Sequence, residues 1–327
     1  MGLKNRFLRT HITLDESAAD SLSQPPVDRY TVEVLPPYDD VPATVERFIK
    51  GITEYSTAYF GLNNRSPTIT YEIRRVDPER LQFLFSAPTR RLVRKIRTQL
   101  VENAPGTRFK EGDTGLPVSE GDSIGGGMLT LGRSDWYPLR TDFDTPPINA
   151  LARILHPDAM RDSRVIIQIL ARPVARRTVS NRWWTRHAES DRDYLRKEKQ
   201  KGIIRRRERP ATPREKTQAD RIDHKVGAPR FKTGIRFLVI GAANYTPSRV
   251  KELSAGFNIF ENPDTGQYFK TKTMRTLRKS RLKPFAEAVR SQELRGWCLP
   301  FQLGVEELAA LFSIPSIQSP NISYAQP

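Results

Sequence analysis

Apolar residues follow two alternating kinds of spacing along the first third of the chain. Every second residue is apolar within 30–35, 69–73 and 81–85, which is the spacing of a strand with one buried face. A short strand is also expected at 108–110. Between these segments the spacing becomes helical, first at Val45, Phe48, Ile49 and Ile52, and then at Leu92, Val93, Ile96 and Leu100. The resulting order of strand, helix, strand, strand, helix, strand is the ferredoxin-like order.

The same two spacings return further along the chain, on both sides of a highly charged segment. The expected strands lie at 128–131, 165–170 and 235–241, and the expected helices at 147–155, 246–260, 284–292 and 305–312.

These patterns predict an α+β fold made of two ferredoxin-like-type α+β lobes. The first lobe covers residues 27–173, and the second covers 233–315 and ends in a short helix. A basic, partly helical linker at 174–232 joins them. Residues 1–26 lack periodicity and end in Ser-Leu-Ser-Gln-Pro-Pro, so a disordered tail is expected there, and an extended tail is expected at 316–327.

Positive charge is concentrated in the linker. The chain carries 54 Lys and Arg against 37 Asp and Glu, and residues 172–232 alone hold 20 basic and 8 acidic residues. Arg205, Arg206 and Arg207 could neutralise phosphates without reading sequence, and Trp183 and Trp184 could stack on unpaired bases. Alternatively, the tryptophans pin a charged surface helix to the body and the charges are merely solvated. The sequence leaves both interpretations open.

A second basic cluster lies between Gln267 and Pro284, where no acidic residue occurs. If 274–283 is helical, several of its cations share one face of the helix. The absence of carboxylates favours a polyanion site, and the alternative is a solvated connection between a strand and a helix. The members of this cluster are Lys270, Lys272, Arg275, Arg278, Lys279, Arg281 and Lys283.

Composition and motifs narrow the remaining chemistry. The longest apolar runs, such as 237–243, are far shorter than the roughly 20 residues of a membrane-spanning helix. Cys298 is the only cysteine, so a reducing, cytoplasmic location is expected. The four histidines are scattered without metal-ligand spacing, and neither G-x-x-x-x-G-K-[ST] nor G-x-S-x-G occurs. We therefore expect no metal, no cofactor and no enzymatic activity in this chain.

Three stretches together resemble the region that precedes the motor in HerA/FtsK-type ATPases of conjugation and type IV secretion. The first runs from 136–141 (WYPLRT) through 144–155 into 164–173, and the second is 235–260. The third, 303–315 (LGVEELAALFSIP), is similar to the Ser-x-Glu-Glu-Leu-Ala…His-x-Pro element where such proteins pass into the nucleotide-binding domain. Gly304 stands where that family has a capping Ser or Thr, and Ser313 stands where His is common.

The resemblance implies a non-catalytic accessory region of a DNA-translocating ATPase, contacting DNA or neighbouring subunits through its basic patches. The motor, whose phosphate-binding loop this chain lacks, would follow in cis or act in trans. Leu308 and Phe312 would dock on it. The assembly would be a homo-oligomer at the inner face of the membrane, among secretion components. The alternative is a stand-alone basic nucleic-acid-binding protein, and a third possibility is a hydrolase with dispersed catalytic residues.

Overall fold

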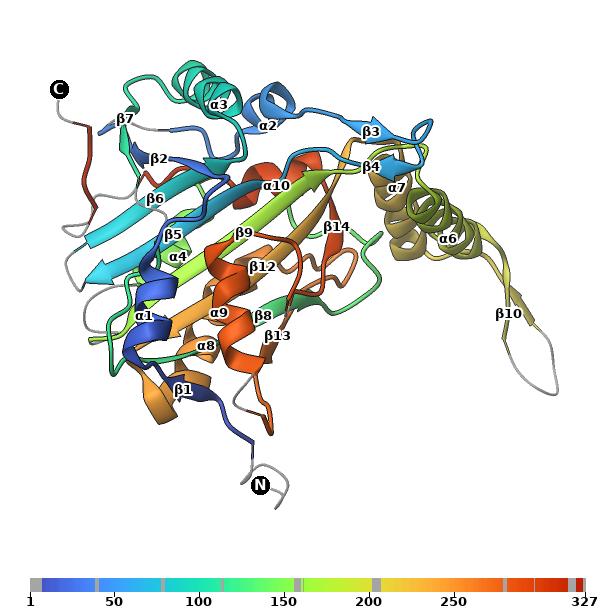
Figure 1. Cartoon of the computed structure of the whole chain (residues 1–327). Helices are drawn as coiled ribbons and strands as arrows, with labels where there is room; N and C mark the ends of the chain where they lie inside the picture. The colour runs from blue at the N-terminus through green and yellow to red at the C-terminus, as the bar shows by residue number, and fades with distance from the viewer. Residues whose placement is uncertain are drawn as a thin grey trace.

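The computed structural model describes residues 8–38, 41–77, 80–112, 115–155, 160, 162–201, 207–278, 281–296, 298–316 and 322–325. Within that part of the chain, an antiparallel sheet of ten strands forms the framework (Figure 1). Its main path runs in the order β1 (His11–Thr13), β8 (Ser123–Leu131), β12 (Arg230–Ile240), β9 (Arg164–Pro173), β5 (Ile69–Asp77), β6 (Arg80–Ala87), β2 (Tyr30–Leu35) and β7 (Arg108–Glu111). Two further strands extend it, β13 (Phe269–Thr273) beside β8 and β14 (Phe301–Gly304) beside β12.

The central strand β9 joins the two halves of the chain. On one side Ile169 lies opposite Tyr71 of β5, and on the other Ile167 lies opposite Phe237 of β12. The continuous apolar run in β9 suits a strand that is buried on both faces of a sheet. The α+β class is confirmed, but the two expected ferredoxin-like lobes are not separate units, because β9 pairs with strands of both.

One face of the sheet carries the larger hydrophobic core. Apolar residues of the central strands, such as Tyr71, Ile167 and Phe237, point to this face and pack under helices from both halves of the chain. The expected helices around 92–100 and 305–312 are confirmed. The covering helices are α2 (Glu46–Ile52), α3 (Arg90–Asn103), α4 (Ile148–Ile154), α8 (Thr246–Ala255) and α10 (Val305–Leu311).

The opposite face is covered by α1 (Glu16–Ser23) and α9 (Leu282–Arg290), which pack on Ile166 and Leu238 (Figure 1). The expectation of a disordered tail is therefore wrong for residues 8–26, where β1 pairs with β8 and α1 buries Leu22. Asp15 caps α1 by accepting a hydrogen bond from the Ala18 amide at 2.8 Å. The apolar face of α1 consists of two alanines and one leucine. This periodic signal is too weak to stand out in the sequence.

A row of buried polar side chains crosses three central strands under α9. Glu72, Gln168 and Arg236 lie directly opposite one another in register. The Gln168 amide donates to the Glu72 carboxylate at 2.5 Å, and the Arg236 guanidinium donates to the Gln168 carbonyl at 2.6 Å. Burial lowers the pKa of Arg236 to about 10. Because each member satisfies its neighbour, this row fixes the register of β5, β9 and β12 beneath α9.

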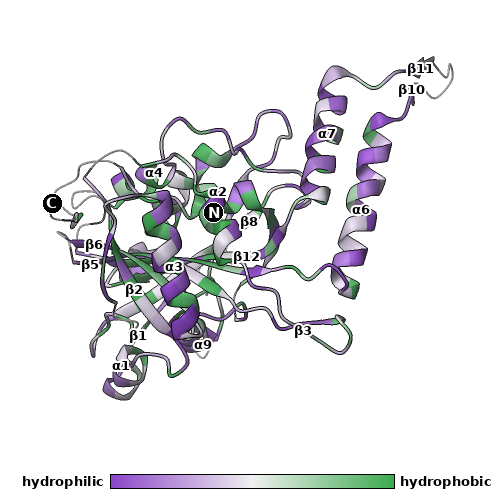
Figure 2. Cartoon of the chain, turned by 90° about the horizontal axis from the view of Figure 1, so that it is seen from above, coloured by the Kyte–Doolittle hydropathy of each residue, from purple (hydrophilic) through white to green (hydrophobic). Residues whose placement is uncertain are grey.

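A long arm leaves the body between β9 and β12. It consists of α6 (Val179–Arg196), the short strands β10 (Lys199–Lys201) and β11 (Arg207–Arg209), and α7 (Pro213–Gly227). Figure 2 shows α6 and α7 side by side, with β10 and β11 at the end far from the sheet. A second, smaller hairpin of β3 (Thr57–Ala58) and β4 (Asn63–Asn64) lies near the foot of the arm. None of the described helices is long and apolar enough to cross a membrane.

Candidate functional site

The arm is an insertion in a β-hairpin of the sheet. β9 ends at Pro173, which lies opposite Phe231 of β12, so the two feet of the arm are adjacent. The Val174 amide donates to the Arg230 carbonyl at 2.8 Å and extends this pairing into the arm. The segment expected to be a linker is therefore held at both ends by the central strands of the sheet.

Local sequence signals explain where α7 begins. Thr212 caps the helix and Pro213 occupies its first turn, where the missing amide of proline costs nothing. The Glu215 carboxylate accepts the Thr212 amide at 2.8 Å, and the Thr212 hydroxyl accepts the Glu215 amide at 3.3 Å. Arg209 forms an ion pair of 2.9 Å with the same carboxylate and thereby attaches β11 to α7. This capping box fixes the turn at the far end of the arm.

Carboxylates of the arm are paired with its own arginines. The Arg192 guanidinium of α6 lies 2.6 Å from the Asp223 carboxylate of α7, and that of Arg196 lies 2.9 Å from Asp220. These hydrogen-bonded pairs raise the pKa of Arg192 and lower that of Asp223. Exposed pairs of this kind contribute little stability. Their main effect is to compensate the acidic side chains between the helices, which leaves the excess of positive charge elsewhere on the arm.

That excess is greatest at the far end. The described residues 196–201 and 207–209 include six Lys and Arg but two Glu, and β10 and β11 lie at the end of the arm farthest from the sheet (Figures 1 and 2). Of the arginines singled out from the sequence, Arg207 begins β11, whereas Arg205 and Arg206 lie outside the described residues. The structure thus carries the basic run away from the body.

The two adjacent tryptophans have different environments. Trp183 is 59% exposed and faces the His187 ring, whereas Trp184 is 3% exposed. The Trp184 indole donates to Asp135 at 2.6 Å, and the Arg230 guanidinium lies 4.0 Å from the centre of its ring. The expectation that Trp184 stacks on bases is therefore wrong, because the side chain is buried in the foot of the arm. Trp183 remains available on the surface.

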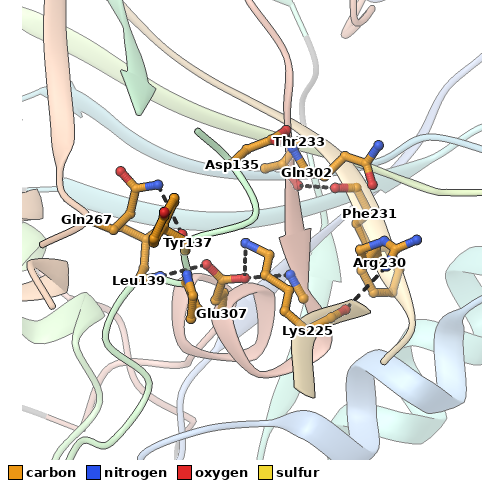
Figure 3. Close-up of polar contacts among 12 residues, drawn as sticks. Asp135, Tyr137, Leu139, Lys225, Arg230, Phe231, Thr233, Gln267, Gln302 and Glu307 are labelled. Atoms are coloured by element: carbon orange, nitrogen blue, oxygen red, sulfur yellow. Dashed lines mark hydrogen bonds and ion pairs between the residues drawn. The ribbon is translucent and has the colours of Figure 1, made fainter. Parts of the chain in front are cut away.

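A buried ion pair fastens the arm to the body. The Lys225 ammonium of α7 lies 2.6 Å from the Glu307 carboxylate of α10, and both side chains are almost fully buried (Figure 3). Glu307 also accepts hydrogen bonds from the amides of Gly304 and Leu139, at 2.6 and 2.8 Å. Removing one member of such a pair would leave an uncompensated buried charge. Figure 3 shows these contacts converging where α7, α10 and the 135–139 loop meet.

Arg230 completes the foot of the arm. Its guanidinium donates to the Asn181 side chain at 2.8 Å and to the Val226 carbonyl at 2.7 Å, and so it contacts both helices. Burial lowers the pKa of this guanidinium, and the nearby Asp135 carboxylate partly offsets the effect. The Asp135 carboxylate in turn accepts a hydrogen bond from the backbone amide of Gln302 at 2.7 Å (Figure 3). Because the same carboxylate accepts the Trp184 indole N–H of α6, it links the arm to β14. The arm is thereby held in a defined direction relative to the sheet.

The second basic cluster does not share one helix. Lys270 and Lys272 are exposed on β13, at the edge of the sheet, residues 274–278 are not helical, and Lys283 lies in the first turn of α9. The conditional argument for a shared helical face therefore fails. Lysines on an edge strand also discourage pairing with other sheets, which gives them a structural role. Arg278 and Arg281 are exposed, Arg275 and Lys283 are partly buried, and Lys279 lies outside the described residues.

Leu308 and Phe312 belong to the main core. Both are almost fully buried, and the Phe312 ring lies 5.5 Å from that of Tyr71 and 5.6 Å from that of Phe85. The expectation that these residues form an incompletely covered docking surface is wrong, because α10 packs against α2 and the sheet.

Groups suited to metal or acid–base chemistry do not converge in the part of the chain that the structure describes. No cluster of three or more His, Cys, Asp or Glu there could hold a metal ion. A small cavity of about 260 Å³ at the foot of α7 is lined by side chains of both signs, including Arg221, His224 and Glu306. The nearest approach of His224 to Glu306 is 3.7 Å, between exposed side chains.

Comparison with known proteins identifies one family. The family described as a domain of unknown function, DUF8128, matches residues 4–327. No curated protein matches the chain.

Proposed function

On the premise that this chain belongs to the DUF8128 family over nearly its whole length, we propose that its arm binds nucleic acid through the phosphate backbone, without reading sequence. The single observation that carries this proposal is the basic segment 196–209 at the far end of a projecting pair of helices.

The arrangement of charge supports a polyanion as the partner. Asp220, Asp223 and Glu215 are engaged by arginines of the arm itself, so they compete little with an incoming phosphate. The strands β10 and β11, which carry basic residues, lie at the end of the arm farthest from the sheet, where the body does not block the approach of a phosphate backbone. Neutralising phosphates releases condensed counterions, so this mode of binding weakens steeply as salt rises.

The rigid attachment of the arm at its foot also supports this proposal. Trp184, Lys225 and Arg230 fix the arm on the sheet through buried contacts. Because the arm is held in one orientation relative to the sheet, a force on a bound nucleic-acid strand would be transmitted to the body. A linker that was only solvated would need no such buried attachments.

We further propose that the chain acts as an accessory region of a conjugative or type IV secretion DNA-translocating ATPase, at the inner face of the membrane. This role rests on the resemblance of the three stretches within 136–315. A phosphate-binding G-x-x-x-x-G-K-[ST] sequence in the same reading frame, or in a neighbouring gene, favours this role over a stand-alone nucleic-acid-binding protein.

The proposal is tested by neutralising the arginine triplet that leads into β11. Changing Arg205, Arg206 and Arg207 together to Gln should weaken binding to unrelated single strands and duplexes alike. Because three phosphate contacts are lost, the slope of log affinity against log salt should become less steep by about 2 units on single strands and about 2.7 units on duplexes. Fluorescence anisotropy of labelled oligonucleotides across a salt series measures both quantities.

A matched control removes the same charge from another surface. Arg90, Arg94 and Arg97 are exposed on α3, and changing all three to Gln should leave the salt slope close to that of the wild type. Equal effects of the two triple variants would show that net charge alone attracts the oligonucleotide. Loss of binding confined to a third variant, with Lys270, Lys272 and Arg278 changed to Gln, would move the site to the second basic cluster.

A further inference from the structure

The hairpin of β3 and β4 presents large apolar side chains to solvent beside the foot of the arm. Phe60 is 99% exposed, Tyr59 70% and Leu62 56%. Each strand of this hairpin has two residues, so the hairpin relies on attachments to the body. The Asn64 side chain donates to the Pro173 carbonyl at 2.7 Å, at the point where β9 leads into the arm. The exposed side chains are therefore held at a fixed place rather than on a free loop.

The tip of this hairpin has an unusual backbone conformation. Tyr59 and Phe60 have φ angles of 53° and 57°, and Gly61 follows with 91°. Bulky side chains rarely adopt this left-handed conformation, and an outlier of this kind often marks a functional position. Gly61 meets a further constraint, because a Cβ atom there would lie 3.3 Å from Cδ of Arg177. The tight turn therefore packs closely against Arg177, which lies between β9 and α6.

A largely apolar hollow of about 810 Å³ opens between the hairpin and the foot of the arm. It is lined mainly by Tyr55, Tyr59, Phe60, Arg176, Arg177 and Pro229. Arg176 and Arg177 are exposed, and no carboxylate among the described residues forms an ion pair with either. The hollow therefore combines aromatic faces with guanidinium groups that are free of acidic partners within the described chain.

We propose that this hollow is a stacking site for unpaired bases, so that the protein binds single-stranded nucleic acid in preference to duplex. The inference rests on the proposed binding by the arm and extends it to the substrate class. Aromatic side chains can stack on any base. Guanidinium groups neutralise phosphates and also stack on the faces of aromatic rings. A strand held by the arm would pass the hollow at its foot. In a duplex the bases are already stacked on each other and cannot enter.

The shape of the surface favours single-stranded nucleic acid over a lipid bilayer. Tyr55, Tyr59 and Arg176 border a concavity, which suits a flat ring with an attached phosphate. An anionic membrane would need only the exposed apolar side chains of the hairpin, including Leu62, which does not line the hollow, and would make no use of the concavity. Binding to anionic vesicles is accordingly one of the outcomes that the experiment distinguishes.

The experiment compares a strand that carries bases with one that lacks them. An oligothymidylate of about 20 nucleotides and an abasic strand of the same length have the same phosphates, so stacking alone separates them. The wild-type chain should bind the thymidylate strand about tenfold more tightly than the abasic strand. Changing Tyr59 and Phe60 together to Leu keeps apolar side chains but removes the aromatic faces. This variant should lose the preference while its affinity for the abasic strand stays unchanged.

Two controls isolate the site. Tyr245 is exposed on a different part of the chain, and Tyr245→Leu should retain the preference for the thymidylate strand. Thermal unfolding should show that the double Leu variant is folded, since both substituted side chains are exposed.

The possible failures are distinguishable. Equal wild-type affinity for the two strands, with steep salt dependence, would overturn the stacking site but leave binding by the arm intact. Absence of binding to either strand would overturn both proposals. Tight binding to phosphatidylserine vesicles that survives the Leu substitutions but not Ser substitutions at Tyr59 and Phe60 would identify the hairpin as a membrane contact instead.

Discussion

Tyr71 illustrates how a single polar atom is accommodated in the main core. Its ring stacks on Phe85 with 4.4 Å between centroids, and its hydroxyl donates to the Ser313 carbonyl at 3.1 Å. Full burial raises the pKa of Tyr71 well above its usual value, because the phenolate would have no water around it. The phenol therefore keeps its proton in the folded chain under conditions where it loses that proton in the unfolded chain.

This difference predicts alkaline destabilisation with a definite sign. A group whose pKa is raised by folding contributes stability below its unfolded pKa, about 10 for tyrosine, and that stability is lost as pH rises further. Above about pH 10 the wild type should lose about 1.4 kcal/mol of unfolding free energy per pH unit more than Tyr71→Phe. Urea unfolding of both proteins at several alkaline pH values measures the difference. Parallel pH profiles would contradict the burial of this phenol.

At the scale of the element, α10 shows how a short helix depends on its surroundings. A seven-residue helix is too short to be stable alone. Its first turn is stabilised by Glu307, which accepts the Gly304 amide, and its apolar side chains are covered by α2 and the sheet. The sequence pattern correctly located the helix. Only the assembled core shows that its apolar face is buried within this chain.

The position of α10 predicts a large loss of stability when the aromatic ring of its C-cap residue, Phe312, is removed. Phe312→Ala should lower the free energy of unfolding by about 3–5 kcal/mol, since a buried ring is replaced by a cavity next to Tyr71 and Phe85. Val101→Ala on the exposed side of α3 serves as the control and should change stability by about 0.5 kcal/mol or less. Chemical denaturation of the isolated chain measures both. Similar stability of Phe312→Ala and the wild type would restore the docking role.

At the scale of the whole molecule, the arm is separable from the framework that carries it. β9 and β12 pair along their length without its help, from Arg164 opposite Ile240 to Pro173 opposite Phe231. A short turn could therefore join the two strands in its place. The body would lose the Lys225 ammonium, which leaves the Glu307 carboxylate without its counter-charge, and the apolar cover of Tyr137 by Trp184.

This separability predicts that the body folds without the arm. Replacing residues 178–228 with a short Gly-containing turn, together with Glu307→Gln, should retain a cooperative unfolding transition and the circular dichroism of the sheet. Nucleic-acid binding should be lost, because the basic segment 196–209 is gone. The same shortened chain with Glu307 retained should be less stable, since a buried carboxylate then lacks its cation. Undiminished binding by the shortened chain would place the nucleic-acid site on the body.

The sequence by itself determined most of the local structure. Apolar spacing located β2, α3, β9, β12 and α10, because periodicity within a segment reports which of its faces is buried. The capping signals at Thr212 and Pro213 likewise depend on neighbours in the chain. The positive charge of the arm is also a property of the sequence, since counting residues requires no coordinates.

Only the tertiary structure decided which segments meet. Trp183 and Trp184 are chemically identical, and only tertiary contacts, such as those of Trp184 with Asp135 and Arg230, determine that one is buried and the other exposed. The pair of Lys225 and Glu307 joins helices that are distant in the sequence, and β9 merges two expected lobes by using both of its edges. Such contacts depend on burial and pairing between remote segments, whose energies exceed local preferences and leave no periodic trace in either segment alone.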